Sequence, residues 1–197
     1  MISEMSKAGV SIDRVFYIMN SPVEADDPDA VGAPMDGDIC FEHVSFAYEN
    51  SAELLHDISF TIKAGTTLGI LGGTGSGKST LMLLLDKLYP LEENSGRITI
   101  GGTDIRKIRT AHLRRNIGMV LQEPFLFSRT LSENIKIARQ SANMAEIREA
   151  SGRAALDEAV EHFDKGYDTF VGERGVTLSG GQKQRAAIAR MLTQKTP

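Results

Sequence analysis

The sequence is poor in cysteine and tryptophan, because its 197 residues include one cysteine, Cys40, and no tryptophan. One cysteine cannot build a disulfide framework or a cysteine metal cage, and this usage is typical of a reducing cytosol. The four histidines lack metal-ligand spacing. No apolar run approaches the roughly 18 to 20 residues that a membrane span requires, and no secretory hydrophobic segment follows Met1.

An excess of positive charge is also missing. Lysine and arginine number 22 against 26 aspartates and glutamates, which gives a formal net charge of -4. This balance argues against a general binder of nucleic acid or of anionic membranes. The most basic run, RKIRTAHLRR at 106–115, is interpreted as a solvated face, so no nucleic-acid partner is expected.

The first 38 residues divide into two segments. Residues 1–20 predict a helix, because Ile12, Val15, Phe16 and Met19 follow the i, i+3, i+4, i+7 spacing of one apolar face. Such a helix either packs on its own domain or is the end of a longer helix. Residues 21–38, rich in Pro, Asp, Ala and Gly, predict a linker whose carboxylates are only solvated.

Hydrophobic patterning predicts an α/β domain after this linker. Residues 39–48 and 55–62 alternate apolar and polar side chains, as half-buried strands do, and 95–105 predicts a hairpin. Two short apolar runs, TTLGIL at 66–71 and IGMVLQ at 117–122, predict central strands covered on both faces. Helical patterns follow at 78–89 and across 130–165.

The glycine-rich stretch GGTGSGKST at 72–80 satisfies G-x-x-x-x-G-K-[ST] between a predicted strand and a predicted helix. Its glycines let successive backbone N–H groups surround a phosphate, and the helix N-terminus adds free donors. Lys78 supplies a positive charge for the β- and γ-phosphates, and the Ser79 hydroxyl is a hard oxygen ligand for Mg²⁺. The predicted binding residues are Gly72, Gly73, Thr74, Gly75, Ser76, Gly77, Lys78, Ser79 and Thr80.

A dinucleotide-binding turn is the competing interpretation, since Gly73 and Gly75 come close to its G-x-G spacing. Lys78 and Ser79 at the helix start argue against it, because the lysine would crowd a pyrophosphate that lies on bare backbone. The stretch therefore predicts a nucleoside-triphosphate site.

The pentapeptide LSGGQ at 178–182, downstream of this loop, resembles the ATP-binding cassette family, and the likeness runs over nearly the whole chain from Ile39. FEHVSFAY ends at Tyr48, where the resemblance implies a ring stacked on the adenine of ATP. VLQEPFLF resembles the family's glutamine loop, which implies that Gln122 contacts Mg²⁺ and the attacking water. TFVGERG at 169–175 resembles the loop before the signature in exporter-type members, although Phe170 stands where an acidic residue is more usual.

The LSGGQ residues have a physical role of their own. Gly180 and Gly181 expose backbone N–H groups at a helix N-terminus, and Ser179 adds a hydroxyl donor, which makes a second anion-binding surface. In the family's arrangement this surface faces the ATP held by a second copy, so the resemblance implies a homo- or heterodimer that encloses two ATP molecules. The predicted contacts in trans are Leu178, Ser179, Gly180, Gly181 and Gln182. An ordinary helix cap is the alternative for these five residues alone.

The resemblance implies the remaining context. The helix at 1–20 resembles the cytosolic end of a last transmembrane helix, which implies a transmembrane domain as partner and a place on the cytoplasmic side of a plasma or inner membrane. The expected fold is a P-loop NTPase with a RecA-like core sheet, an N-terminal antiparallel β part and a helical signature subdomain. The expected segments are a helix at 1–20, a linker at 21–38, an ATP-binding core at 39–128 and the helical subdomain at 129–197.

One expected element has no counterpart in the sequence. The family places an Asp-Glu pair at the end of an apolar strand after the signature helix, and the only look-alike, Asp157-Glu158, precedes the signature in alanine-rich helical sequence. We expect the chain to stop before that strand, with its C-terminal core strands and catalytic glutamate missing, and to hydrolyse ATP negligibly by itself. A cassette ATPase without a transport role and a non-hydrolytic nucleotide-binding domain are the alternatives to a transporter.

Overall fold

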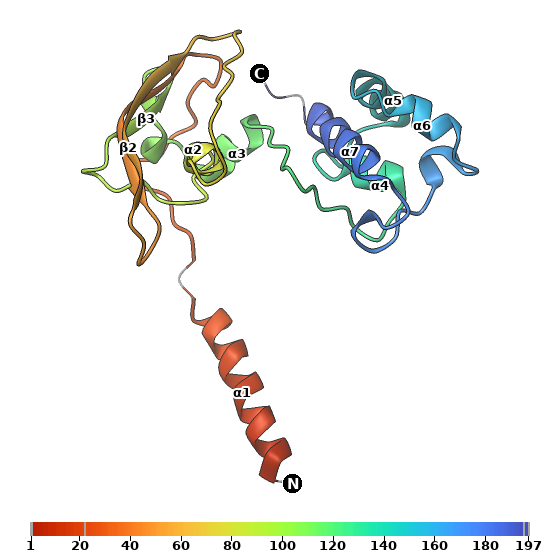
Figure 1. Ribbon diagram of the computed structural model, residues 1–197, viewed down its shortest axis with the longest axis horizontal. Coiled ribbons are helices and arrows are strands. Elements are labelled where there is room, and N and C mark those ends of the chain that lie inside the picture. The colour runs from red at the N-terminus through yellow and green to blue at the C-terminus, as the bar shows by residue number, and fades with distance from the viewer. Residues whose placement is uncertain (1, 22, 195, 197) are drawn as a thin grey trace.

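The computed structural model describes residues 2–21, 23–194 and 196, with side chains from Gly9 onward in the first helix. Figure 1 shows three parts along the chain: a long helix, a lobe built on a sheet, and a lobe built of helices. We call residues 23–116 the β lobe and residues 124–193 the helical lobe. The first helix, α1 (Ile2–Met19), confirms the predicted helix.

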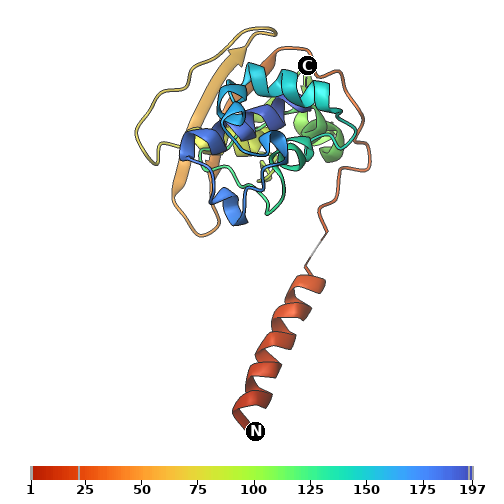
Figure 2. The same ribbon diagram turned by 90° about the vertical axis from the view of Figure 1, so that its right-hand side faces the viewer.

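Helix α1 extends away from both lobes in the two views (Figures 1 and 2). The apolar residues that define its predicted face are exposed, with Val15 and Phe16 both 55% accessible. Of the two alternatives for this helix, packing of its apolar face on its own domain is therefore wrong for the described side chains. Across the described residues, none of the helices combines the length and the apolar content that a membrane span requires.

The β lobe is organised by a four-stranded antiparallel sheet in the order β2-β1-β3-β4. Its strands are β1 (Ile39–Ala47), β2 (Glu53–Ile62), β3 (Arg97–Ile100) and β4 (Thr103–Asp104), as the alternating pattern and the predicted hairpin indicated. Phe41 of β1 is opposite both Phe60 and Ile98, and its ring stacks on Phe60 with centroids 4.5 Å apart.

Three short helices pack with this sheet around one core: α2 (Lys78–Leu85), the 3-10 helix η1 (Ile105–Lys107) and α3 (Thr110–Asn116). Helix α2 is shorter than the predicted 78–89, because the chain leaves helical geometry at Asp86 and Lys87 takes a positive φ of 52°. The buried side chains that close this core include Phe41, Val44, Leu84, Ile98, Ile100, Ile105, Ile108 and Leu113.

The helical lobe has a separate hydrophobic core. It contains α4 (Leu131–Lys136), α5 (Met144–Arg153), α6 (Asp157–Glu161), α7 (Gly180–Thr193), and the 3-10 helices η2 (Gly166–Asp168) and η3 (Glu173–Gly175). Thr130 with Glu133, and Asn143 with Glu146, form capping boxes that start α4 and α5. Reciprocal bonds of this kind satisfy first-turn N–H groups, which explains why these helices begin where they do.

The C-terminal end of α7 ties the two lobes together. The side-chain amide of Gln194 donates hydrogen bonds to the carbonyls of Arg114 and Arg115, at 3.0 and 2.9 Å. Gly118 lies so close to Met191 that an added Cβ would be 2.6 Å from its Cγ. The lobes therefore meet at the end of α3 and the start of the connecting segment 117–123.

The two predicted central strands are wrong for the described structure. Residues 66–71 and 117–122 form no strand, and Leu68, Leu71 and Leu121 are 44%, 97% and 55% exposed. A short apolar strand of a parallel sheet is buried only when neighbouring strands pair with its edges and helices cover both faces. Among the described residues no strand pairs with either segment, so neither has the hydrogen-bonding partner that a strand requires.

The predicted linker is docked on the β lobe rather than free. Ala33 is 6% exposed, and Val31 forms a parallel bridge with Ile108. Glu24 binds Arg114 through two hydrogen bonds of 2.8 Å, and Asp26 accepts from the amide and hydroxyl of Thr110. The expectation that these carboxylates are only solvated is therefore wrong, because composition alone does not show which partners a loop meets.

Candidate functional site

The glycine-rich loop at 72–77 leads directly into the N-terminus of α2 and is exposed up to Gly77. Gly77 is the N-cap and has φ 86° and ψ 4°, a left-handed conformation that favours glycine. A Cβ at this position would lie 2.5 Å from Cδ2 of Leu55 in β2. No side chain caps the helix, so the N–H groups of its first turn point outward without an intrahelical acceptor.

The side chains of this loop supply hydrogen-bond donors suited to a polyphosphate. The Lys78 ammonium donates to the carbonyls of Gly72 and Gly73, at 2.8 and 2.6 Å, and is thereby held at the mouth of the loop. Ser79 is exposed, and its hydroxyl makes no hydrogen bond within the described residues. Residues 72–80 contain no carboxylate, so nothing in the stretch itself repels an anion.

Tyr48 follows the end of β1 and lies against the same helix. Its hydroxyl is 2.9 Å from the Thr80 hydroxyl, and its ring meets the rings of Phe46 and Tyr89 edge to face, with centroids 5.0 Å apart in each pair. Thr80 is only 4% exposed. The predicted phosphate-binding and adenine-binding residues therefore lie together in the β lobe, and Thr80 contacts Tyr48 rather than facing solvent.

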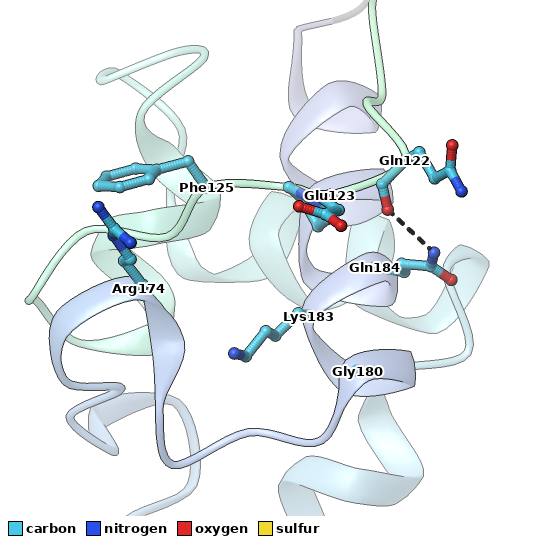
Figure 3. Close-up of a pocket in the computed structure, with 8 residues that line it drawn as sticks. Gln122, Glu123, Phe125, Arg174, Gly180, Lys183 and Gln184 are labelled. Carbon is cyan, nitrogen blue, oxygen red and sulfur yellow. Dashed lines mark hydrogen bonds between the residues drawn. The ribbon is translucent and has the colours of Figure 1, made fainter. Parts of the chain in front are cut away.

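Gln122 lies instead with the helical lobe. Its carbonyl accepts a hydrogen bond of 3.3 Å from the Gln184 side chain, and its own side chain points away from the neighbouring pocket (Figure 3). Ser79, the other predicted Mg²⁺ ligand, lies in the β lobe at the start of α2, and within the described residues no hydrogen bond joins it to Gln122.

The LSGGQ residues form the start of α7. Ser179 and Gln182 make a capping box, in which the Ser179 hydroxyl accepts from the Gln182 amide and the Gln182 side chain accepts from the Ser179 amide. Gly180 and Gly181 are exposed, and a Cβ at Gly180 would meet nothing within 4 Å. The side chains of Ser179 and Gln182 therefore act as an ordinary helix cap, as the alternative interpretation proposed. The N–H groups of the two glycines stay available to an anion.

The Leu178 side chain is 6% exposed and belongs to the core of the helical lobe. Any contact that Leu178 makes with a ligand must therefore come from its backbone. Its burial fixes the start of α7 on the lobe, so the exposed residues after it have a defined position.

An open pocket of about 530 Å³ lies between the connecting segment and the start of α7. Its lining is Gln122, Glu123, Pro124, Phe125, Arg174, Gly180, Lys183 and Gln184. Figure 3 shows the Lys183 and Arg174 side chains on its rim, from α7 and η3. Sequence reasoning missed these two cations, although Lys183 lies three residues from Gly180 and so shares its helix face.

Buried polar contacts hold this part of the helical lobe in place. Arg190 of α7 donates to the carbonyls of Asn134 and Phe125, both at 2.9 Å, and burial lowers the pKa of its guanidinium. The Asn134 side chain in turn bonds both the amide and the carbonyl of Phe127. These bonds fix residues 125–127 relative to α7. The position of the LSGGQ residues at the start of α7 is therefore linked to the position of the residues that follow Gln122.

The candidate site therefore consists of two separate helix starts, each predicted to bind an anion. The start of α2, with Tyr48, belongs to the β lobe, whereas the start of α7, with Gln122, belongs to the helical lobe (Figure 1). Ser79 at one start and Gly180 at the other are exposed to solvent, so neither helix start covers the other.

Comparison with known proteins identifies relatives of this arrangement. A family profile described as "ABC transporter" matches residues 55–197. The chain is 45% identical over 196 residues to YgaD of Bacillus subtilis, provisionally named as a multidrug export ATP-binding/permease protein, and the match covers 98% of this chain and 33% of YgaD. It is 40% identical over 197 residues to the beta-(1→2)glucan export ATP-binding/permease protein NdvA of Rhizobium johnstonii, covering 99% of this chain and 33% of NdvA.

A solved structure, that of a bacterial Atm1-family ABC exporter with ATP bound, superimposes with a TM-score of 0.88 at 38% identity. The superposition covers 98% of this chain and 34% of that one. The chain thus spans about a third of the length of the relatives it matches. The likeness confirms the predicted fold class, a P-loop α/β domain with an antiparallel β part.

Proposed function

Because the chain belongs to the ABC transporter family, we propose that it is the ATP-binding domain of an exporter and that the complete protein hydrolyses ATP to move a substrate across a membrane. The observation that carries this proposal is a pair of helix starts in separate lobes: that of α2, where Ser79 is exposed, and that of α7, where Gly180 is exposed. Each is built to bind an anion, and one ATP can bridge two of them only when they come from different copies.

The β-lobe residues bind the nucleotide itself. The loop Gly72–Gly77 and the start of α2 hold the triphosphate, and Lys78 exchanges its two carbonyl partners for phosphate oxygens. The Tyr48 ring stacks on the adenine. Among the described residues, no group of three or more His, Cys, Asp or Glu side chains is placed to hold a metal ion, so Mg²⁺ depends on phosphate oxygens, the Ser79 hydroxyl and Gln122.

Bound Mg²⁺ neutralises phosphate charge. A rotation of the helical lobe toward the β lobe brings Gln122 to it, since in this structure Gln122 is bonded to Gln184 of α7 and, within the described residues, to no residue of α2. The connecting segment 117–123 is the place where that rotation occurs.

The helical-lobe residues cover the ATP of a neighbouring domain. Ser179, Gly180 and Gly181 present donors to the γ-phosphate held on the partner's loop, and the capping box keeps these donors aligned. The partner is a second nucleotide-binding domain, identical or distinct. We propose that helix α1 is the end of a transmembrane-domain helix and that the chain lies on the cytoplasmic side of the membrane; the exposure of its apolar residues supports this.

Hydrolysis is a property of the complete protein. Asp157 and Glu158 lie in the first turn of α6 in the helical lobe, on a different lobe from the triphosphate loop. Neither supplies a general base beside the loop. The chain by itself therefore binds ATP with little turnover.

Titration of the chain with ATP, followed by calorimetry, tests the binding step. Lys78→Ala is expected to weaken ATP binding at least about tenfold, because it removes a charge-assisted bond to phosphate. Lys165→Ala is the matched control, since Lys165 is an exposed lysine in the helical lobe. Equal affinity of Lys78→Ala and the unmodified chain would reject the assignment of the loop.

Sedimentation velocity with and without ATP tests the dimer. Lys78→Ala and Gly181→Asp should each abolish ATP-dependent association. An equimolar mixture of the two should restore part of it, because one composite site then keeps both an intact loop and an intact signature. No association of the unmodified chain at saturating ATP, or no rescue in the mixture, contradicts enclosure between two copies of this chain.

A further inference from the structure

The ring of Tyr48 is fixed by the helix that follows the phosphate loop, and not only by its own strand. Its hydroxyl bonds the Thr80 hydroxyl in the first turn of α2, and its ring packs edge-on against Tyr89, just beyond the end of that helix. Phe46 contacts it from β1. Of these three side-chain contacts of the described residues, two therefore come from α2 and the residues just after it.

Thr80 and Ser79 have different surroundings although they are adjacent. Ser79 is exposed at the start of α2, where a phosphate-bound cation would lie, whereas Thr80 is 4% exposed and directs its hydroxyl at Tyr48. A buried hydroxyl needs a hydrogen-bond partner, and Tyr48 is the side chain that provides one here. The Tyr89 hydroxyl, by contrast, makes no hydrogen bond within the described residues.

We propose that Thr80 is a positioning residue for base recognition, which acts by holding the Tyr48 ring at a fixed place relative to the phosphate loop. The proposal rests on the proposed function, because it assumes that Tyr48 contacts the base and residues 72–79 contact the phosphates. It assigns Thr80 to recognition of the purine through Tyr48, rather than to direct contact with phosphate.

The physical basis is pre-organisation. Tyr48 begins the turn between β1 and β2, and without the hydroxyl bond only the ring contacts with Phe46 and Tyr89 restrict its side-chain torsions among the described residues. Binding a base would then require ordering the ring, which weakens binding. One hydrogen bond of ordinary strength corresponds to an effect of about three- to tenfold on affinity.

A double-mutant cycle on the 197-residue chain tests this, with calorimetric affinities for ATP and for inorganic tripolyphosphate. Tyr48→Phe and Thr80→Val should each weaken ATP binding about three- to tenfold, and the double variant should be no weaker than either. Tripolyphosphate affinity should stay unchanged in all three. Thr80→Ser, which keeps the hydroxyl, should bind ATP like the unmodified chain, and Tyr89→Phe is the matched control for loss of a ring hydroxyl.

Hydrogen exchange without nucleotide provides a second readout that does not depend on ATP binding. Residues 48–52 should exchange faster in Tyr48→Phe and Thr80→Val by the same factor, and at the original rate in Tyr89→Phe. Additive losses in the cycle overturn the proposal. An equal loss of tripolyphosphate affinity in Thr80→Val overturns it as well, since Thr80 is then a phosphate ligand. If the unmodified chain binds tripolyphosphate but not ATP, the assignment of Tyr48 fails, and if it binds neither, the proposed function fails.

Discussion

Single residues decide whether the phosphate loop can adopt its shape, and Gly77 has the strictest requirement. It combines a φ of 86° with a position against Leu55 that leaves no room for a Cβ. Gly73, in the same loop, has no positive φ, and a Cβ added there would meet nothing within 4 Å. The sequence motif therefore includes glycines that are required by backbone geometry and others that only leave space for a ligand.

Gly77→Ala should lower the free energy of unfolding by about 1 to 3 kcal/mol, because it forces a side chain into a left-handed backbone and into Leu55. It should also weaken ATP binding, since the loop has to shift. Gly69→Ala is the control, because Gly69 has no positive φ and a Cβ there meets nothing within 4 Å. Chemical denaturation of the two variants measures the difference. Similar stability of the two would show that the loop relaxes without strain.

At the scale of elements, segment 23–34 connects α1 to the helices of the β lobe. Asp26 acts as a long-range cap for α3, whose own N-cap residue, Arg109, provides no side-chain bond. Its carboxylate accepts from the amide of Thr110 at 2.8 Å and from the Thr110 hydroxyl, and Lys87 approaches to 3.5 Å. The first residue of α3 is thus capped by a side chain that lies 84 residues earlier in the sequence.

The bond from the Thr110 hydroxyl, with smaller effects of its amide and of Lys87, lowers the pKa of Asp26. A lowered pKa in the folded state means that the carboxylate stabilises the fold above the unfolded pKa of about 3.9 and that this stability is lost as the pH falls through the folded value. Asp26→Asn, which keeps an acceptor but no charge, should therefore be less stable than the unmodified chain at pH 7, with the gap closing below about pH 4.

Asp26→Ala removes the acceptor too and should cost about 1 kcal/mol, the usual value of a helix cap. Asp29→Asn is the matched control, because Asp29 is an exposed aspartate of the same segment whose side chain makes no hydrogen bond in the described residues. Thermal unfolding between pH 3 and pH 7 gives the profiles. A gap between Asp26→Asn and the unmodified chain that is as wide at pH 3 as at pH 7 would exclude the charge as its cause.

Sequence patterning predicted those elements whose partners are close in the chain. Strands β1 and β2, the hairpin at 95–105 and the helix at Lys78 form from local pattern and short connections. Residues 66–71 and 117–122 show the opposite case, because an apolar run specifies a buried strand only when other segments pair with it. The role of Asp26 could not be predicted either, since it depends on a contact with Thr110 that no local pattern records.

The two unpaired segments, one in the β lobe and one connecting the lobes, expose apolar side chains, most of all Leu71 of the β lobe. Exposed apolar surface of this kind promotes association. Leu71→Lys should therefore reduce concentration-dependent association of the chain, measured by light scattering. Val176→Lys is the control, because Val176 is 74% exposed but lies in the helical lobe, outside both segments. Equal effects of the two substitutions would assign the change to net charge rather than to the segment.

At the scale of the whole molecule, the described residues form two lobes with separate cores, joined by a short segment, the Gln194 side chain and the packing of Met191 on Gly118. Each lobe has its own core, and the helices of one lobe hardly meet the elements of the other (Figure 1). The proposed function requires this arrangement, because Gln122 can reach the nucleotide only if the lobes rotate. We expect the Gln194 amide, which donates to the carbonyls of Arg114 and Arg115, to act as a clasp that limits such rotation.

Gln194→Ala should loosen the clasp and expose the connecting segment more often. Leu121 and Phe125, which are 55% and 51% exposed, are the expected sites of chymotrypsin cleavage. Loss of two hydrogen bonds of about 1 kcal/mol each increases the open population, so initial cleavage should be severalfold faster. Gln140→Ala, at an exposed glutamine without a hydrogen bond in the described residues, should cleave at the original rate. Unchanged cleavage of Gln194→Ala would mean that packing of Met191 on Gly118, and not the clasp, sets the angle between the lobes.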